Sequence, residues 1–291
     1  MLSWKAKRRK VGKRIPKSSI LNPKSYPVIA LFDSGYGGLT VLKSFLKVLP
    51  KYDYLYLGDS ARVPYGPRSP ETIQKFSEEG IQFFIKEKVP LVIVACNTIS
   101  AVALRYLQKK YSDQIKILGV VRPLAEYAAK NSAKKRIGIA GTRATIASGA
   151  YKTEIQKLDP ACEVIGQACP LLVPLIEENW HHKPETRMIL RKYLRSLKTH
   201  NIDTLILGCT HYPMLQKEFQ KIMGARVHVP NPGDIVAASF EDYLQRHPEI
   251  EKKLTKKGTQ KFLTTGDVDR FEEFSTIFLE GTKINVQKIA L

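Results

Sequence analysis

The sequence predicts an α/β fold made of two pseudo-symmetric parallel-sheet domains, with the active site in the cleft between them. Short β-rich runs alternate with longer stretches of helical periodicity, which is typical of parallel α/β architecture. The two halves of the chain also carry similar motifs in the same order, which indicates an approximate internal repeat. "VIALFDSGYGG" opens the first half and "RIGIAGTRAT" the second, and later apolar runs end in "IVACNT" and "ILGCTH". Because 291 residues exceed the usual length of one domain, a duplicated α/β unit explains the pattern.

Strands and crossover helices follow from apolar periodicity. Two segments, 69–88 and 183–200, carry apolar residues at three- and four-residue spacing, so we predict crossover helices there. The predicted strands are short runs rich in β-branched and aromatic residues, namely 27–33, 52–59, 89–97, 115–121, 135–142, 162–170, 202–210 and 225–230.

Domain boundaries are predicted at two proline-bearing joins, "GVVRPL" and "VPNPGD". We expect a first domain of residues 27–121 plus 233–291 and a second of residues 122–232, since the C-terminal piece returns to complete the first domain.

Residues 1–26 are predicted to form a disordered basic N-terminal extension. This segment holds nine of the 47 lysines and arginines, and no acidic residue precedes Asp33, so it supplies much of the net charge of +20. A contact of this arm with nucleic acid or anionic lipid is an alternative interpretation. The basic body also suits a small acidic substrate.

The cellular setting follows from composition. We find no apolar run near the roughly 18 to 20 residues of a membrane span, and the N-terminus lacks the apolar stretch of a signal peptide. Four irregularly spaced cysteines do not suggest a disulfide framework. We therefore expect a cytoplasmic protein without a membrane span, and a homodimer, since cleft enzymes of this size often pair.

Two of the cysteines stand out because polar residues follow them at predicted strand ends. Cys96 precedes Asn97 and Thr98, and Cys209 precedes Thr210 and His211. In open α/β sheets ligands bind beyond the carboxyl ends of the strands, so both thiols would face a ligand.

Several kinds of chemistry use cysteine. The usual spacing of a zinc site is absent, so we predict no metal. A nucleophile activated by His211 would not explain a second matching cysteine. Two thiols that flank one carbon and exchange its proton across opposite faces are what a racemase needs. Cys162 and Cys169 are interpreted as buried core residues.

Three further motifs carry candidate site residues. The turn "DSGYGG" starts with Asp33 and Ser34 and departs from a dinucleotide loop, because Thr40 occupies the last glycine position. Asp33 would also repel phosphate and could instead accept a hydrogen bond from an ammonium group. Tyr65 projects from the proline-rich turn "RVPYGPRSPE", and Glu177 and Glu178 follow "PLLVPLI".

Together these segments resemble the glutamate racemase family, whose members supply D-glutamate for bacterial peptidoglycan biosynthesis without a cofactor. The resemblance spans residues 28–278 and rests on "FDSGYGG", "PYG", "ACNT", "GTRATIASGAY", "CPLLVPLIEE" and "GCTHYP". It departs from the family pattern at Tyr36, where a small aliphatic residue is common, and in the basic extension.

The resemblance implies site roles for this chain. Cys96 and Cys209 would be the acid/base thiols for the D-face and the L-face of glutamate. Asp33 would assist Cys96, and His211 with Glu177 would assist Cys209; Glu177 is preferred to Glu178 as the first acid after "VPL". The substrate-binding residues would be Asp33, Ser34, Tyr65, Gly66, Asn97, Thr98, Thr210 and His211.

Two alternatives remain at this stage. An aspartate or hydantoin racemase could use the same pair of thiols, and side-chain length would decide between the substrates. A nucleic-acid or membrane-associated protein could instead work through the basic surface.

Overall fold

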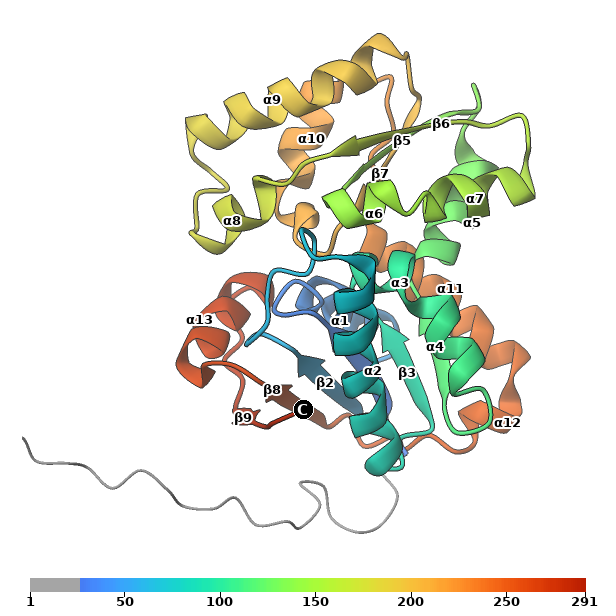
Figure 1. Cartoon of the computed structure of the whole chain (residues 1–291), viewed down its shortest axis with the longest axis vertical. Helices are drawn as coiled ribbons and strands as arrows, with labels where there is room; N and C mark the ends of the chain where they lie inside the picture. Colours follow the sequence, from blue (N-terminus) through green and yellow to red (C-terminus); the bar gives the residue numbers. More distant parts are fainter. Residues whose placement is uncertain (1–26) are drawn as a thin grey trace, which may run out of the picture.

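Two separate parallel sheets form the framework of the computed structural model, which describes residues 27–291 (Figure 1). The predicted basic extension lies outside the described residues. The first sheet has the strand order β4-β3-β1-β2-β8-β9 and the second has the order β6-β5-β7. Every strand pair is parallel. The strands are β1 (Ile29–Asp33), β2 (Tyr54–Gly58), β3 (Leu91–Val94), β4 (Lys116–Gly119), β5 (Arg136–Gly141), β6 (Glu163–Ala168), β7 (Thr204–Gly208), β8 (Gln260–Thr264) and β9 (Val286–Lys288).

The internal repeat seen in the sequence corresponds to a repeated strand order. In the first sheet β1 lies between β3 and β2, and in the second β5 lies between β7 and β6. The strands that end before the two candidate cysteines, β3 and β7, therefore occupy equivalent places. The predicted class of two pseudo-symmetric parallel-sheet α/β domains is confirmed.

Helices connect the strands and cover the sheets. The crossover helices predicted from periodicity are α2 and α9, each with proline in its first turn, where the missing N–H costs nothing. The helices are α1 (Leu39–Val48), α2 (Pro70–Lys86), α3 (Asn97–Val102), α4 (Leu104–Lys110), α5 (Val121–Asn131), α6 (Arg143–Ala147), α7 (Ala150–Leu158), α8 (Leu172–Glu177), α9 (Pro184–Thr199), α10 (Gln216–Met223), α11 (Pro232–Arg246), α12 (Pro248–Glu251) and α13 (Val268–Phe278), with a 3₁₀ turn η1 (Tyr212–Leu215).

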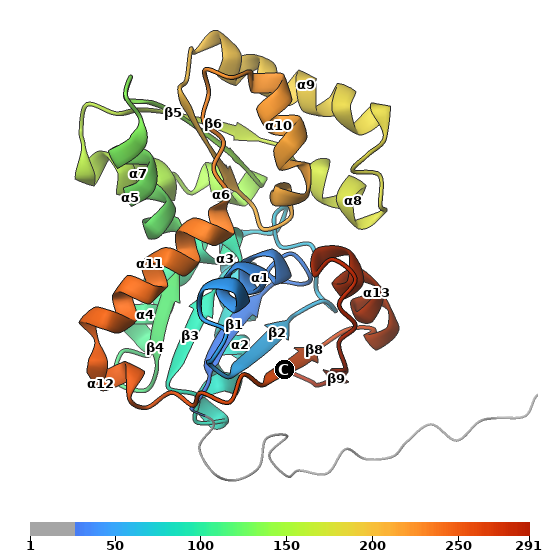
Figure 2. The ribbon, with the colours of Figure 1, turned by 180° about the vertical axis from the view of Figure 1, so that it is seen from behind.

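The first sheet is buried on both faces, as its continuous apolar strands predict. All five residues of β1 are buried, and alternate ones join different cores. Ile29 and Leu31 belong to the core that α1 and α11 cover, whereas Ala30 and Phe32 belong to the core under α2 and α4. Figure 2, the view from behind, shows α1 and α11 in front of this sheet.

The core under α1 and α11 continues into the second sheet and ties the two halves together. It includes Ile29 and Leu31 of β1, Leu124 of α5, and Ile206 of β7. Helix α11 contacts both α5 and β7. This continuous apolar packing holds the carboxyl ends of both sheets near the same region.

The strand predictions were wrong in two places. Residues 225–230 form no strand and make only a single bridge between Thr204 and His228, because Pro230 has no N–H to extend a ladder. Strands β8 and β9 were not among the predicted runs; they extend the first sheet beyond β2.

Within residues 27–291, no helix combines the length and apolarity needed to cross a bilayer.

Candidate active site

A cavity of about 170 Å³ lies beyond the carboxyl ends of the strands, and segments from both sheets line it. Of the eleven residues predicted for the site, ten line this cavity. They are Ser34, Tyr65, Gly66, Cys96, Asn97, Thr98, Glu177, Cys209, Thr210 and His211. The structure therefore brings together residues that are far apart in the sequence, and only Asp33 lies off the cavity wall.

On the side of the first sheet, the Cys96 thiol follows β3 at the start of α3. Its Sγ lies 3.5 Å from Oγ of Ser34, which belongs to the turn after β1. Cys96 is buried, and this burial together with the nearby carboxylate of Asp33 raises the pKa of the thiol to about 12. Cys96 is therefore a neutral thiol at physiological pH.

Asp33 lies behind this wall and is completely buried. Its Oδ2 accepts a hydrogen bond of 3.0 Å from the N–H of Gly35, whereas Oδ1 has no partner within residues 27–291. Burial raises the pKa of Asp33, although the charge of His211 and the N–H groups of the turn oppose this effect. An unsatisfied buried oxygen of this kind is costly and points to a role in the site.

On the side of the second sheet, Cys209 follows β7 and lies beside an imidazole. Nδ1 of His211 is 4.0 Å from Sγ of Cys209, and Nε2 is 3.0 Å from Oε1 of Glu177, the last residue of α8. Burial alone would lower the pKa of His211, but its contacts with Cys209 and Glu177 raise it to about 10. The imidazole is therefore protonated at neutral pH and places a positive charge next to Cys209.

Glu177 and Glu178 differ clearly in position. Glu177 is mostly buried and contacts His211, whereas the side chain of Glu178 is 70% exposed and lies 3.8 Å from Arg270. The geometry thus favours Glu177 as the acid that acts on His211.

Polar groups of both halves meet at the cavity. Oγ1 of Thr98 lies 2.9 Å from Oγ1 of Thr142, and the Tyr151 hydroxyl donates a hydrogen bond to Oδ1 of Asn97. Helix α3 begins at Asn97, so the N–H groups of its first turn have no acceptor within the helix. These N–H groups and hydroxyls are donors that a carboxylate can use.

Tyr65 and Gly66 lie in the segment between β2 and α2. Tyr65 lines the cavity, and its hydroxyl donates a hydrogen bond to buried Asp59. The carbonyl of Gly66 accepts a hydrogen bond of 3.1 Å from the N–H of Ala144 in α6. This segment therefore bridges the first sheet to the second.

Sequence reasoning missed several lining residues. Thr142 and Arg143 lie in the "GTRAT" segment whose similarity to the first turn was noted, so the repeat itself could have indicated them. Cys169 was assigned to the core; it is fully buried, yet it also lines the cavity at the end of β6.

Within residues 27–291, no group of three histidine, cysteine or acidic side chains is placed to hold a metal ion.

Paired α/β domains around a cavity with a thiol on each side match the arrangement that a racemase, an isomerase, needs. The family model described as Asp/Glu/Hydantoin racemase matches residues 38–238. The glutamate racemase of Geobacter metallireducens is 39% identical over 266 residues, which cover 91% of this chain and 97% of the relative.

Solved structures agree with this match. Glutamate racemase isoform RacE1 of Bacillus anthracis has a TM-score of 0.85 and 35% identity, with 93% of this chain and 99% of the other covered. Glutamate racemase of Francisella tularensis, solved with D-glutamate, has a TM-score of 0.82 and 33% identity, with 90% and 97% covered. The chain belongs to the Asp/Glu/hydantoin racemase family and, within it, to the glutamate racemases. The predicted resemblance and the prediction of an amino-acid racemase are confirmed.

Proposed function

We propose that this racemase interconverts L-glutamate and D-glutamate by a two-base mechanism in which Cys96 and Cys209 are the proton carriers. The observation that carries the proposal is the position of the two thiols, which follow equivalent strands of the two sheets and line one cavity. The D-glutamate would serve peptidoglycan biosynthesis, in the cytoplasm.

The proposed reaction moves one proton off the α-carbon and another onto its opposite face. With L-glutamate, the Cys209 thiolate removes the α-proton, so the Cα–H bond breaks and an S–H bond forms. The Cys96 thiol then gives its proton to the other face of the carbanion. The two sulfurs exchange protonation states in each turnover, and D-glutamate reacts by the reverse sequence.

The charges around the two thiols support this assignment. The imidazolium of His211 would stabilise a thiolate on Cys209, and Glu177 would hold the proton on His211. The raised pKa of Cys96 keeps its proton available for transfer. The surroundings of the two sulfurs therefore differ, with a cationic imidazole beside Cys209 and the carboxylate of Asp33 near Cys96.

The α-proton of an amino acid is weakly acidic, so negative charge that forms on the substrate must be stabilised. We assign this role to Asn97, Thr98, Thr210 and the N–H groups at the start of α3. Donors fixed in this way are worth about 2.7 to 4 kcal/mol each where one has been removed from an oxyanion hole.

The remaining predicted residues would hold the substrate. Ser34, Tyr65 and Gly66 would contact it from the first domain and His211 from the second. Buried Asp33, whose Oδ1 lacks a partner, would interact with the ammonium group and assist Cys96. We propose that the domains, residues 27–121 plus 233–291 and residues 122–232, close on the substrate and expel water. We also propose a homodimer, which light scattering of the purified protein would test.

Proton exchange in heavy water tests the proposed reaction. L-glutamate and D-glutamate are incubated separately in D₂O without added cofactor, and optical rotation and α-deuteration are followed. We expect both enantiomers to lose rotation, with deuterium entering the product at the α-carbon. An aspartate or hydantoin substrate that reacts in place of glutamate would refute the substrate assignment, and loss of both signals would refute the reaction.

A further inference from the structure

A second hollow, of about 650 Å³, lies between α9 and α10. Figures 1 and 2 show α9 at the end of the molecule farthest from the first sheet. Arg187, Arg191, Arg195 and Lys198 line one wall, and Lys221 lines the other. We call this hollow the α9–α10 groove; it shares no residue with the racemase cavity.

The four cations of α9 form a continuous row. Arg187, Arg191 and Arg195 are four residues apart, and Lys198 follows three residues later. Residues at this spacing lie on one face of a helix, about 6 Å apart along its axis. The adjoining side of the helix holds buried leucines that fix α9 to the second domain: Leu190, Leu194 and Leu197. The row is therefore straight and rigidly supported.

Acidic side chains neutralise little of this charge. Glu218 is the only acid that lines the groove, and it lies 3.5 Å from Arg187. Within residues 27–291, Arg191, Arg195, Lys198 and Lys221 form no ion pair. Residues 1–26 contain no acid that could supply one.

Some other cations of the chain are neutralised by acids. Near α2, Arg62 pairs with Asp59 and Glu79, and Lys110 pairs with Glu78. Several like charges held together in one hollow repel one another, and an anionic ligand would relieve this repulsion. The groove thus differs from an ordinary solvated face, where charges of both signs alternate.

We propose that the α9–α10 groove binds the phosphodiester backbone of a nucleic acid. A straight row of arginines with a cation on the facing wall suits a linear chain of phosphates, because the guanidinium fork bonds two phosphate oxygens at once. No aromatic residue lines the groove, so it offers no platform for base stacking and binding is independent of sequence. A flat membrane surface fits the groove less well, because the cations of the groove face one another across a recess.

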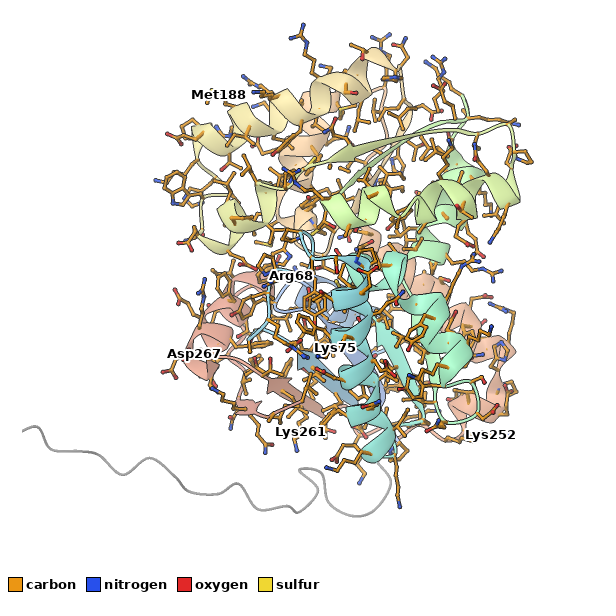
Figure 3. All side chains as sticks on the ribbon, viewed as in Figure 1. Arg68, Lys75, Met188, Lys252, Lys261 and Asp267 are labelled. Carbon is orange, nitrogen blue, oxygen red and sulfur yellow. The ribbon has the colours of Figure 1, made fainter. Side chains whose placement is uncertain are left out.

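Fluorescence anisotropy of the full chain with a labelled oligothymidylate of roughly 20 nucleotides tests this proposal. The groove variant is R191Q/R195Q/K198Q. The matched control, K75Q/K252Q/K253Q, removes the same charge from other faces; Figure 3 labels Lys75 and Lys252 far from Met188 of α9. A third variant, K5Q/K7Q/R8Q/R9Q/K10Q, neutralises part of the N-terminal segment. Thermal unfolding of each variant, followed by circular dichroism, verifies that it folds.

We expect the groove variant to bind about tenfold or more weakly at moderate salt than the matched control. Its plot of log affinity against log salt should be shallower by about 2, since each cation lost removes about 0.7 from the slope for a single strand. Bound oligonucleotide should also protect the amides of α9 and α10 from hydrogen exchange in the unmodified protein.

Three results would overturn the proposal. The first is equal affinity of the groove variant and the matched control. The second is loss of all binding in the N-terminal variant, with no protection of α9. The third is a groove variant that loses binding to phosphatidylserine vesicles but keeps its oligonucleotide affinity, which would assign the groove to membranes.

Discussion

Gly37 lies directly against the imidazole of His211. A Cβ atom on Gly37 would be 2.5 Å from Nδ1 of that ring, closer than real side chains approach. Gly37 belongs to the turn after β1 in the first sheet, whereas His211 follows β7 in the second. The absence of a side chain at residue 37 thus sets the position of the imidazole and, through it, the surroundings of Cys209.

Gly37→Ala should therefore lower racemase activity. The added methyl group would displace His211 or Thr210, whose Oγ1 would lie only 2.3 Å from the new Cβ, or it would separate the two sheets. Misplacement of a catalytic group by about 1 Å can cost about 100-fold in rate. Turnover of both enantiomers is measured together with thermal unfolding. Full activity in a folded variant would contradict the role given to this contact.

Cys96→Ser and Cys209→Ser should each abolish racemisation, with losses of at least about 10² to 10⁴ in kcat, because each removes one of two required proton carriers. Cys162→Ser is the control, since Cys162 is buried and lines no part of the cavity. Polarimetry with each enantiomer measures the effect. Near-normal turnover in either of the first two variants would disprove the two-base mechanism.

Alkylation by iodoacetamide at pH 8 should modify Cys209 faster than Cys96. The thiolate is the reactive form, and a pKa of about 12 leaves Cys96 with a thiolate fraction on the order of one in ten thousand. Exposure does not explain a difference, because the two residues are 4% and 5% exposed. Mass spectrometry of digested protein measures the two rates, and His211→Asn should reduce the difference between them.

The stability difference between the unmodified protein and His211→Asn should depend on pH. Folding raises the pKa of His211 from its ordinary value of 6.5 to about 10, so the folded state holds a proton that the unfolded state releases between these values. The stabilisation is complete below about pH 6.5 and is lost as the pH rises through 10. Urea unfolding at several pH values measures it; a difference that grows with pH would contradict the assignment.

Asp59→Asn should raise KM more than it lowers kcat. Asp59 is buried at the end of β2 and accepts hydrogen bonds from Arg62, Tyr65 and Thr265, so it fixes the segment that carries Tyr65 and Gly66. Loss of one charged hydrogen-bond partner in such a site costs about 1 to 3 kcal/mol of stability. Tyr65→Phe removes only one of these bonds and should have a smaller effect on KM. Steady-state kinetics and thermal unfolding of both variants check this order.

The sequence predicted the buried centre of the fold better than its edge. Continuous apolar runs such as Ile29–Asp33 indicate strands because both faces are buried. Strand β8 begins with Gln260 and Lys261 and has only three buried residues, so its local pattern is weak. It becomes a strand because β2 offers an open edge, which is information that the local sequence does not contain.

The site followed from motifs, while the supporting contacts did not. Ten predicted residues line the cavity because each stands in a polar turn after a strand or in a motif of the family. Asp59 supports the site through hydrogen bonds to Arg62, Tyr65 and Thr265, and no spacing in the sequence reveals these contacts. The same holds for Asp33, whose motif indicated its importance but not its position behind the wall.

The two sides of the domain boundary differ in the cost of separating them. Near the cavity the halves meet through hydrogen bonds, such as those of Thr98 with Thr142 and of Thr40 with the carbonyl of Thr210. Water can replace such bonds at a net cost of about 1 kcal/mol each. On the opposite side, where Figures 1 and 2 show α5 and α11, separation would expose apolar surface at about 25 cal/mol per Å². The two domains should thus rotate apart about a hinge at α5 and α11. The substrate would then enter from the other side, between α8 and α13.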